Sequence, residues 1–164
     1  MTDFEDRFFA LLTEVMDLIG RTEEEALRVG EFTNLSRSEM HTLKNIGLYD
    51  TKTMGETAAQ LNVTTGTLSV QIDRLVKKNY VIRQRREEDR RVVELKLSKK
   101  GKLAYRMHDR FNRLLLENIL EPLDSEGQEA LYQTLARVQD YLEEQHTKYT
   151  ARKAEKKQKE KENV

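Results

Sequence analysis

Apolar residues recur every three or four positions in several stretches of this chain, which is the spacing of one helix face. The first stretch has them at Phe4, Phe8, Leu11, Leu12, Val15, Met16 and Ile19. This pattern predicts a long amphipathic helix within residues 2–30. Such a helix cannot cover its own apolar stripe, so it needs other helices from the same chain or from a second subunit.

Two places fit a capping box, in which a Ser or Thr and a Glu three residues later satisfy free N–H groups at a helix start. They are residues 36–39 and 53–56. A further helix is expected to begin at Thr64, after a tight turn at residues 62–63. Its buried side would carry Leu68, Ile72, Leu75 and Val76. The last two helices and their turn predict a helix-turn-helix.

The segment after these helices has the alternating pattern of a β-hairpin. Residues 80–86 form the first expected strand, residues 87–91 a charged tip, and residues 92–97 the returning strand. A hairpin placed directly after a helix-turn-helix makes residues 53–97 a candidate winged helix-turn-helix, which is a DNA-reading module.

Two more helices are predicted after the hairpin, separated by Pro122, because proline ends a helix. The fold class is therefore mainly α with a small β-wing, as a winged helix-turn-helix plus a helical dimerisation lobe. We expect one domain at residues 1–147, with the reader at 53–97 and dimerisation helices at 2–30 and 98–146. Residues 148–164 have no apolar period and are expected to form a disordered basic tail.

The net charge of zero hides a strong segregation along the chain. Residues 51–100 carry 12 Lys and Arg against 6 Asp and Glu, whereas residues 1–50 carry 5 against 11. The positive excess therefore falls on the candidate reader. Because a local basic face attracts phosphates whatever the total charge, the composition is compatible with DNA binding.

Several classes of function lack their usual sequence signals. The 164 residues include no cysteine, no run of about 18 apolar residues and no secretion-signal pattern, which favours a cytoplasmic protein without disulfides. A phosphate-binding glycine loop and a G-x-S-x-G nucleophile motif are also missing. We therefore expect no enzyme activity, no cofactor and no membrane association.

The solvent side of the predicted recognition helix begins with small polar residues, which can enter a major groove about 12 Å wide. Cations follow near its end, and arginines crowd the hairpin tip. We predict DNA contacts from Thr64, Thr65, Gly66, Thr67, Ser69, Val70, Arg74, Lys77, Arg86, Arg90 and Arg91. Glu87, Glu88 and Asp89 are interleaved with these arginines. Some of the arginines could therefore simply lie in solvent at the hairpin tip without contacting DNA.

Over residues 4–145 this arrangement resembles the MarR family of bacterial transcription regulators. The resemblance rests on the capped helix at 36–46, the helix-turn-helix, the wing motif at 89–91 and the segment LSKKG at 97–101. It implies a homodimer whose terminal helices interlock and whose wings straddle a pseudo-palindromic operator in double-stranded DNA. It also implies that Asp89 stabilises the wing while Arg91 reaches the minor groove.

Two segments are similar to a subgroup of that family, the FabT-like repressors of fatty acid biosynthesis in Gram-positive bacteria. They are LSRSEMHTLKNIG at 35–47 and KKGKLAYRMHDRF at 99–111. The similarity implies a ligand-modulated repressor, with acyl-acyl carrier protein as corepressor. A pocket for the acyl chain would be lined by Met16, Ile19, Met40, His41, Leu43, Met107 and Phe111, although the same residues would also serve as core and dimer packing.

Other readings remain open at this stage. His41 and His108, with Glu23, Glu24 or Glu25, could form a zinc sensor, but Asn112 stands where a further histidine would be needed. No metal site is therefore predicted, and His146 is expected to be solvated. A regulator responding to zinc or a phenolic ligand, or a winged-helix adaptor that binds protein, are the alternatives.

Overall fold

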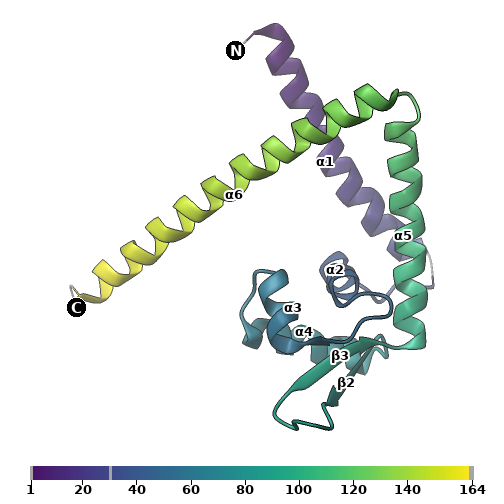
Figure 1. Cartoon of the computed structure of the whole chain (residues 1–164), viewed down its shortest axis with the longest axis vertical. Coiled ribbons are helices and arrows are strands. Elements are labelled where there is room, and N and C mark those ends of the chain that lie inside the picture. Colours follow the sequence, from purple (N-terminus) through teal and green to yellow (C-terminus); the bar gives the residue numbers. More distant parts are fainter. Residues whose placement is uncertain (1, 30, 163–164) are drawn as a thin grey trace. The chain divides into compact units, whose positions relative to one another are not determined.

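The computed structural model describes the backbone of residues 2–29 and 31–162, with side chains up to residue 152. The chain divides into two compact units, Met1–Phe111 and Asn112–Val164, and each is described by itself. The first unit holds the helices and strands that follow one another from the N-terminus to the first half of α5 (Figure 1). The sequence analysis had placed residues 1–147 in one domain, which stays a prediction.

The first unit contains the predicted helices in the predicted order. They are α1 (Asp3–Val29), α2 (Arg37–Ile46), α3 (Met54–Gln60), α4 (Thr65–Lys77) and the beginning of α5 (Lys99–Leu120). Both predicted capping boxes are present, since Ser36 and Thr53 accept the N–H groups of Glu39 and Glu56 while each glutamate accepts the N–H of its own cap residue. Thr64 caps α4 in the same way, by accepting the N–H of Thr67.

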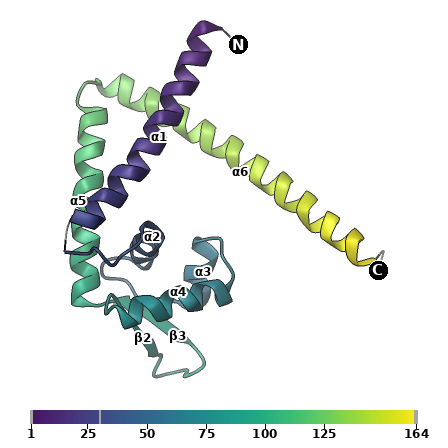
Figure 2. The same cartoon turned by 180° about the vertical axis from the view of Figure 1, so that it is seen from behind.

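A three-stranded antiparallel sheet completes this unit, in the order β1-β3-β2. Strands β2 (Val81–Arg85) and β3 (Val93–Leu97) form the predicted hairpin, with Val81 opposite Leu97 and Arg85 opposite Val93. The third strand, β1 (Lys52–Thr53), was missed, because two residues are too few to show an alternating pattern. Seen from behind, α3 and α4 lie together beside the hairpin (Figure 2). The mainly α fold with a β-wing is confirmed.

The core of the first unit lies among α2, α3, α4, the sheet and the start of α5. Its fully buried members are Met40, Leu43, Ile46, Leu68, Ile72, Leu75, Tyr80 and Leu95. The buried stripe predicted for α4 is confirmed except at Val76, which is 39% exposed. Val76 lies next to Leu75 on the helix, and the neighbouring elements cover only one of the two.

The second unit consists of the end of α5, a turn, and α6 (Ser125–Glu162). Asp124 starts α6 by accepting the N–H of Gly127 at 2.8 Å. The amide of Gln128 donates to the carbonyls of Leu120 and Leu123, which holds the turn. α6 continues through residues 148–162, where a disordered tail was expected, because this stretch is free of the Gly and Pro that interrupt helices.

None of the helices in the described part of the chain is both long and apolar enough to cross a membrane.

Gly101 gives a test of how tightly α5 packs against the reader. A side chain at this position would overlap the carbonyl oxygen of Tyr80, which belongs to the backbone and cannot rotate away. We expect Gly101→Ala to destabilise the protein by at least about 2 kcal/mol, as overpacking does in a dense core. The measurement is the denaturant midpoint at one fixed protein concentration.

Gly55 provides the matched control, because it also lies in a helix but has open space around its α-carbon. Gly55→Ala should be neutral or stabilise the protein by up to about 1 kcal/mol, since alanine is the better helix former. Equal midpoints for the two variants would contradict the close approach of α5 to Tyr80.

Candidate nucleic-acid interface

The exposed side of α4 carries the residues predicted to read DNA. Leu68, Ile72 and Leu75 face the core, so the opposite side of the helix is left to solvent. Exposed there are Thr64, Thr65, Gly66, Thr67, Val70, Arg74 and Lys77, with Ser69 partly buried. The geometry is that of a helix with a small, polar first turn and a basic last turn.

The hydroxyl groups at the start of α4 are not equivalent. Thr64 accepts the N–H of Thr67 at 3.2 Å, and the two hydroxyls lie 2.9 Å apart. Thr64 therefore has a structural task as a helix cap. Thr65 and Thr67 extend this start into solvent, where a base edge could be approached.

A groove runs between the start of α2 and the exposed side of α4. Its walls are Ser36, Ser38 and Glu39 on one side and Thr67, Val70, Gln71 and Arg74 on the other. Sequence reasoning had considered Ser36 only as a cap and had not considered Ser38 or Gln71. The available signal was the pair of serines in the first turn of a helix, whose N–H groups and positive dipole end suit phosphate oxygens.

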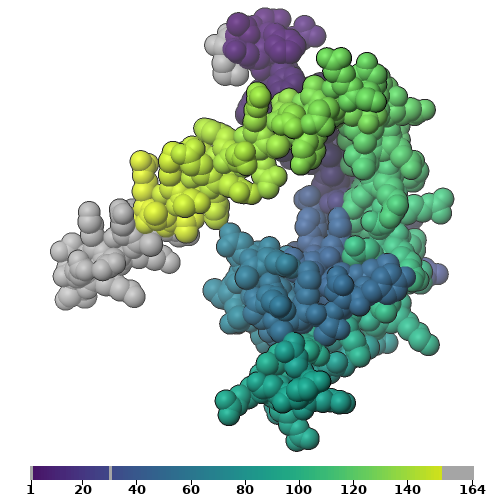
Figure 3. Space-filling view, viewed as in Figure 1, coloured from purple at the N-terminus to yellow at the C-terminus, as the bar shows by residue number. Residues whose placement is uncertain are grey.

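The hairpin tip is shaped by Asp89. Its Oδ1 accepts the backbone N–H of Arg91 at 3.0 Å, and its carbonyl accepts the N–H of Val92 at 2.9 Å. These bonds orient the backbone that carries Arg90 and Arg91, which are both exposed. The hairpin, coloured teal, protrudes from the body of the first unit (Figure 3).

Arg86 is held where β2 runs into the hairpin tip. Its Nε donates to Oε1 of Glu94 at 2.6 Å, and Glu94 also lies 3.3 Å from the amide of Gln84. The hydrogen bond from Arg86, followed by that from Gln84, lowers the pKa of Glu94, so this carboxylate stays charged. Arg86 was predicted to contact DNA, but part of its guanidinium is used to brace the hairpin.

A second brace joins the wing to α4. Nη1 of Arg83 lies 2.9 Å from Oδ1 of Asp73, which is on the last part of the helix. Among the described residues, no ion pair involves Arg74, Lys77, Arg85, Arg90 or Arg91. The positive charge that is free to attract phosphates therefore includes the end of α4 and the hairpin tip.

The residues suggested for an acyl pocket occupy several environments. Met40 and Leu43 are fully buried in the core, Met16 and Met107 are 57% and 49% exposed, and His41 is exposed. Ile19 and Phe111 are partly buried. They lie on α1, α2 and α5 of the first unit.

His108 is buried beside Glu23. Its Nε2 lies 3.4 Å from Oε1 of Glu23, whose other oxygen accepts Nε of Arg37 at 2.8 Å. Burial, and then the positive charge of Lys44, lower the pKa of His108 despite the nearby carboxylate. The ring is therefore neutral at pH 7, and its contact with Glu23 is not an ion pair.

The remaining carboxylates considered for zinc are paired elsewhere. Glu24 and Glu25 pair with Arg28 on the surface of α1. Within the described residues, no group of three or more His, Asp or Glu side chains could hold a metal ion.

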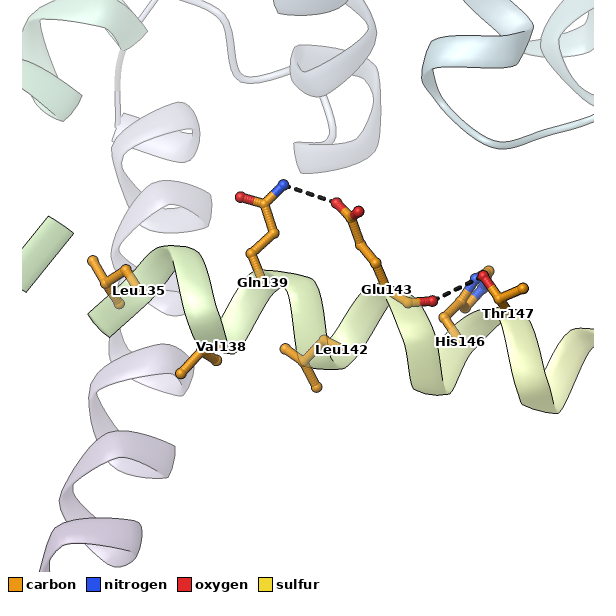
Figure 4. Close-up of a pocket in the computed structure, with 7 residues that line it drawn as sticks. All are labelled: Leu135, Val138, Gln139, Leu142, Glu143, His146 and Thr147. Atoms are coloured by element: carbon orange, nitrogen blue, oxygen red, sulfur yellow. Dashed lines mark hydrogen bonds between the residues drawn. The ribbon is translucent and has the colours of Figure 1, made fainter. Parts of the chain in front are cut away.

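A shallow hollow follows one face of α6 in the second unit. Leu135, Val138 and Leu142 lie along it, with His146 toward its end (Figure 4). Gln139 donates to Glu143 at 2.8 Å, and Thr147 donates to the carbonyl of Glu143 at 2.9 Å. Leu135, Val138 and Leu142 are about half exposed, so this apolar face is open to solvent.

Comparison with known proteins agrees with this geometry. The MarR family profile matches residues 35–93, which cover α2, the helix-turn-helix and the hairpin as far as the first residue of β3. The DNA-bound FabT of Streptococcus pneumoniae is 34% identical, with a TM-score of 0.78, and the match covers 85% of this chain and 98% of that one. The HTH-type transcriptional regulator YfiV of Bacillus subtilis is 28% identical over 110 residues, which are 67% of this chain and 69% of YfiV.

The likeness also extends to more distant structures. A MarR mutant from Escherichia coli in complex with operator DNA has a TM-score of 0.61 at 23% identity, covering 84% of this chain and 99% of that one. At this identity the likeness concerns the fold alone. Because the chain matches the family profile and also matches FabT over 98% of the FabT chain, it belongs to the MarR family of DNA-binding transcription regulators.

Proposed function

We propose that this protein represses transcription as a homodimer that binds a pseudo-palindromic operator. The observation that carries the proposal is the exposed side of α4, where small polar residues precede unpaired cations beside a protruding hairpin. Two such helices would enter successive major grooves about 34 Å apart. FabT, MarR and MepR have each been solved with DNA, which supports the same mode for this chain.

The apolar surface of the terminal helices supports the dimer. Phe4 and Phe8 on α1 are 72% and 56% exposed, and Leu142 on α6 is 57% exposed. Large apolar side chains at helical spacing are seldom left to water over so many turns. A second copy of the chain would cover them.

We assign the DNA contacts by position along the reader. Thr65, Gly66, Thr67, Ser69 and Val70 would face base edges in the major groove. Arg74 and Lys77, with the groove serines Ser36 and Ser38, would contact the phosphate backbone. Arg90 and Arg91 would reach the adjacent minor groove, whose negative potential attracts arginine. Thr64, Asp89 and Arg86 then hold the reading groups in place, with some DNA contact left to the exposed part of Arg86.

We further propose that acyl-acyl carrier protein is the corepressor and that the regulated genes serve fatty acid biosynthesis. The support is the similarity of residues 35–47 and 99–111 to the FabT-like subgroup, together with the 34% identity to FabT. The acyl chain would be received by α1, α2 and α5 near Met16 and Met107. Binding there would raise the population of the DNA-competent state by the ligand's differential affinity for it.

One experiment separates these ligand classes. Operator gel shifts are run with acyl-acyl carrier protein, with zinc, with a chelator and with small phenolic acids. Tighter binding with the acylated carrier and not with the unacylated carrier is the expected result. A response to zinc or to phenolic acids alone would replace the acyl proposal without affecting the assignment of the reader.

The wing assignment is tested by Arg91→Ala. We expect operator affinity to fall by roughly tenfold. The slope of log affinity against log salt concentration should become shallower by about one. Arg28→Ala is the control, because Arg28 is exposed on α1 and pairs with Glu24 and Glu25. Unchanged operator affinity of Arg91→Ala at physiological salt would remove the wing from the interface.

The base-reading assignment is tested by Thr67→Ala, measured on operator and on random duplex. Loss of a hydroxyl that faces bases should lower operator affinity about 5- to 10-fold while leaving random-sequence affinity nearly unchanged. Thr67→Ser retains the hydroxyl and should retain most of the discrimination. Equal losses on both duplexes would mean that α4 does not read bases at this position.

A further inference from the structure

The turn that follows α4 makes contacts with several other elements of the first unit. It consists of Lys78, Asn79 and Tyr80, and it leads directly into β2. Lys78 closes the helix by donating its N–H to the carbonyl of Arg74, and Asn79 takes a left-handed conformation with φ of 64°. The direction of the recognition helix therefore depends on what holds this turn, together with the packing of its buried side.

The ammonium group of Lys78 is fully engaged within the protein. Its Nζ lies 2.8 and 2.7 Å from the two carboxylate oxygens of Glu39 and 2.6 Å from the carbonyl oxygen of Asn34. These three acceptors match the three donors of a lysine. Lys78 is thus not available to a phosphate, although its position beside Lys77 in the sequence suggests the opposite.

Glu39 connects this contact to the start of α2. The same carboxylate accepts the N–H of Ser36 at 2.9 Å, as the second half of the capping box. Only 6% of its side chain is exposed. Burial by itself raises the pKa of Glu39, but the hydrogen bond and charge of Lys78, with the bonds from Ser36, lower it overall. The carboxylate is ionised at neutral pH, so one charged group holds the end of α4 to the beginning of α2.

Asn34 adds the loop before α2 to the same cluster. Its Oδ1 accepts the hydroxyl of Tyr80 at 2.6 Å, and Tyr80 is completely buried with its ring edge against Phe32. Lys100 of α5 lies over the Tyr80 ring, with its Nζ 4.2 Å from the ring centre. The turn therefore joins the loop before α2, the end of α4 and the start of α5.

A small rotation at this turn has a large effect at the reading end. α4 has 13 residues, and at 1.5 Å per residue it is about 20 Å long. A tilt of about 10° at Lys78 would move the far end, near Thr65, by roughly 3 Å, which is the length of a hydrogen bond. Contacts to base edges would be lost, whereas contacts of flexible arginines to phosphates would adjust.

We propose that Lys78 is a positioning residue for sequence reading: its contacts with Glu39 and Asn34 fix the angle of α4, and hence which bases its first turn meets. This inference rests on α4 being the recognition helix, as proposed above. It assigns to Lys78 no contact with DNA.

The test uses Lys78→Met, which retains the length of the side chain and removes its charge. Affinities for operator and for random duplex are measured at one salt concentration, with protein concentrations corrected for the folded fraction. We expect the operator preference, which is the ratio of operator affinity to random-duplex affinity, to fall by about tenfold. Specific DNA-binding proteins usually have a preference much larger than this. Lys99→Met, at an exposed lysine with no ion pair among the described residues, is the control for loss of one positive charge and should keep the preference.

Glu39→Gln gives a second, milder variant, because glutamine can still accept the N–H of Ser36 while its charge is removed. It should also lower the operator preference, and the double variant should lose no more than Lys78→Met alone, since both act through one contact. If Lys78→Met does not fold, Glu39→Gln decides the question.

The outcomes separate the two levels of inference. Equal losses on operator and random duplex, or additive losses in the double variant, would show Lys78 to be a phosphate contact or a purely structural residue, and would overturn the proposal. Failure of the unmodified protein to prefer any operator over random duplex would instead overturn the proposed function.

Discussion

The carbonyl group of Tyr80 approaches α5 so closely that only a glycine fits opposite it. Ser98 donates its N–H to this carbonyl at 2.9 Å, and the hydroxyl of Ser98 bridges the carbonyl of Asn79 and the N–H of Gly101. The turn between α4 and β2 and the first turn of α5 are thereby fixed to one another. Because the hairpin and the recognition helix both start or end here, their mutual position depends on this backbone contact.

Some charged residues of the reader hold its elements together, and others are free to contact DNA. Asp73 and Glu94 neutralise Arg83 and Arg86, and Glu39 neutralises Lys78. These pairs stiffen the frame, although the surface ones contribute little stability each. The unpaired cations of the reader include those at the end of α4 and at the hairpin tip, where the proposed function needs them. The basic excess of residues 51–100 thus overstates the charge available to phosphates.

The regulatory part of the proposal concerns a different set of side chains. Met40 and Leu43 belong to the same core as the buried side of α4, whereas Met16 and Met107 are half-exposed. A ligand received near the latter two could act on α2, and α2 is tied to the end of α4 through Glu39. The proposed pocket and the proposed positioning residue Lys78 are therefore compatible, because α2 would link them within the first unit.

Local patterns alone determined much of this protein. Capping boxes, apolar periodicity and alternation predicted α1 to α6 and the hairpin, because these signals depend on neighbours within one or two turns. The resemblance of the same residues to the MarR family predicted the family and the winged fold. The pairing of Lys78, Arg83 and Arg86 could not be predicted, since their partners lie 39, 10 and 8 residues away and depend on how the elements pack. Only the tertiary structure decided which cations remain free, because a charge is neutralised by its neighbour in space.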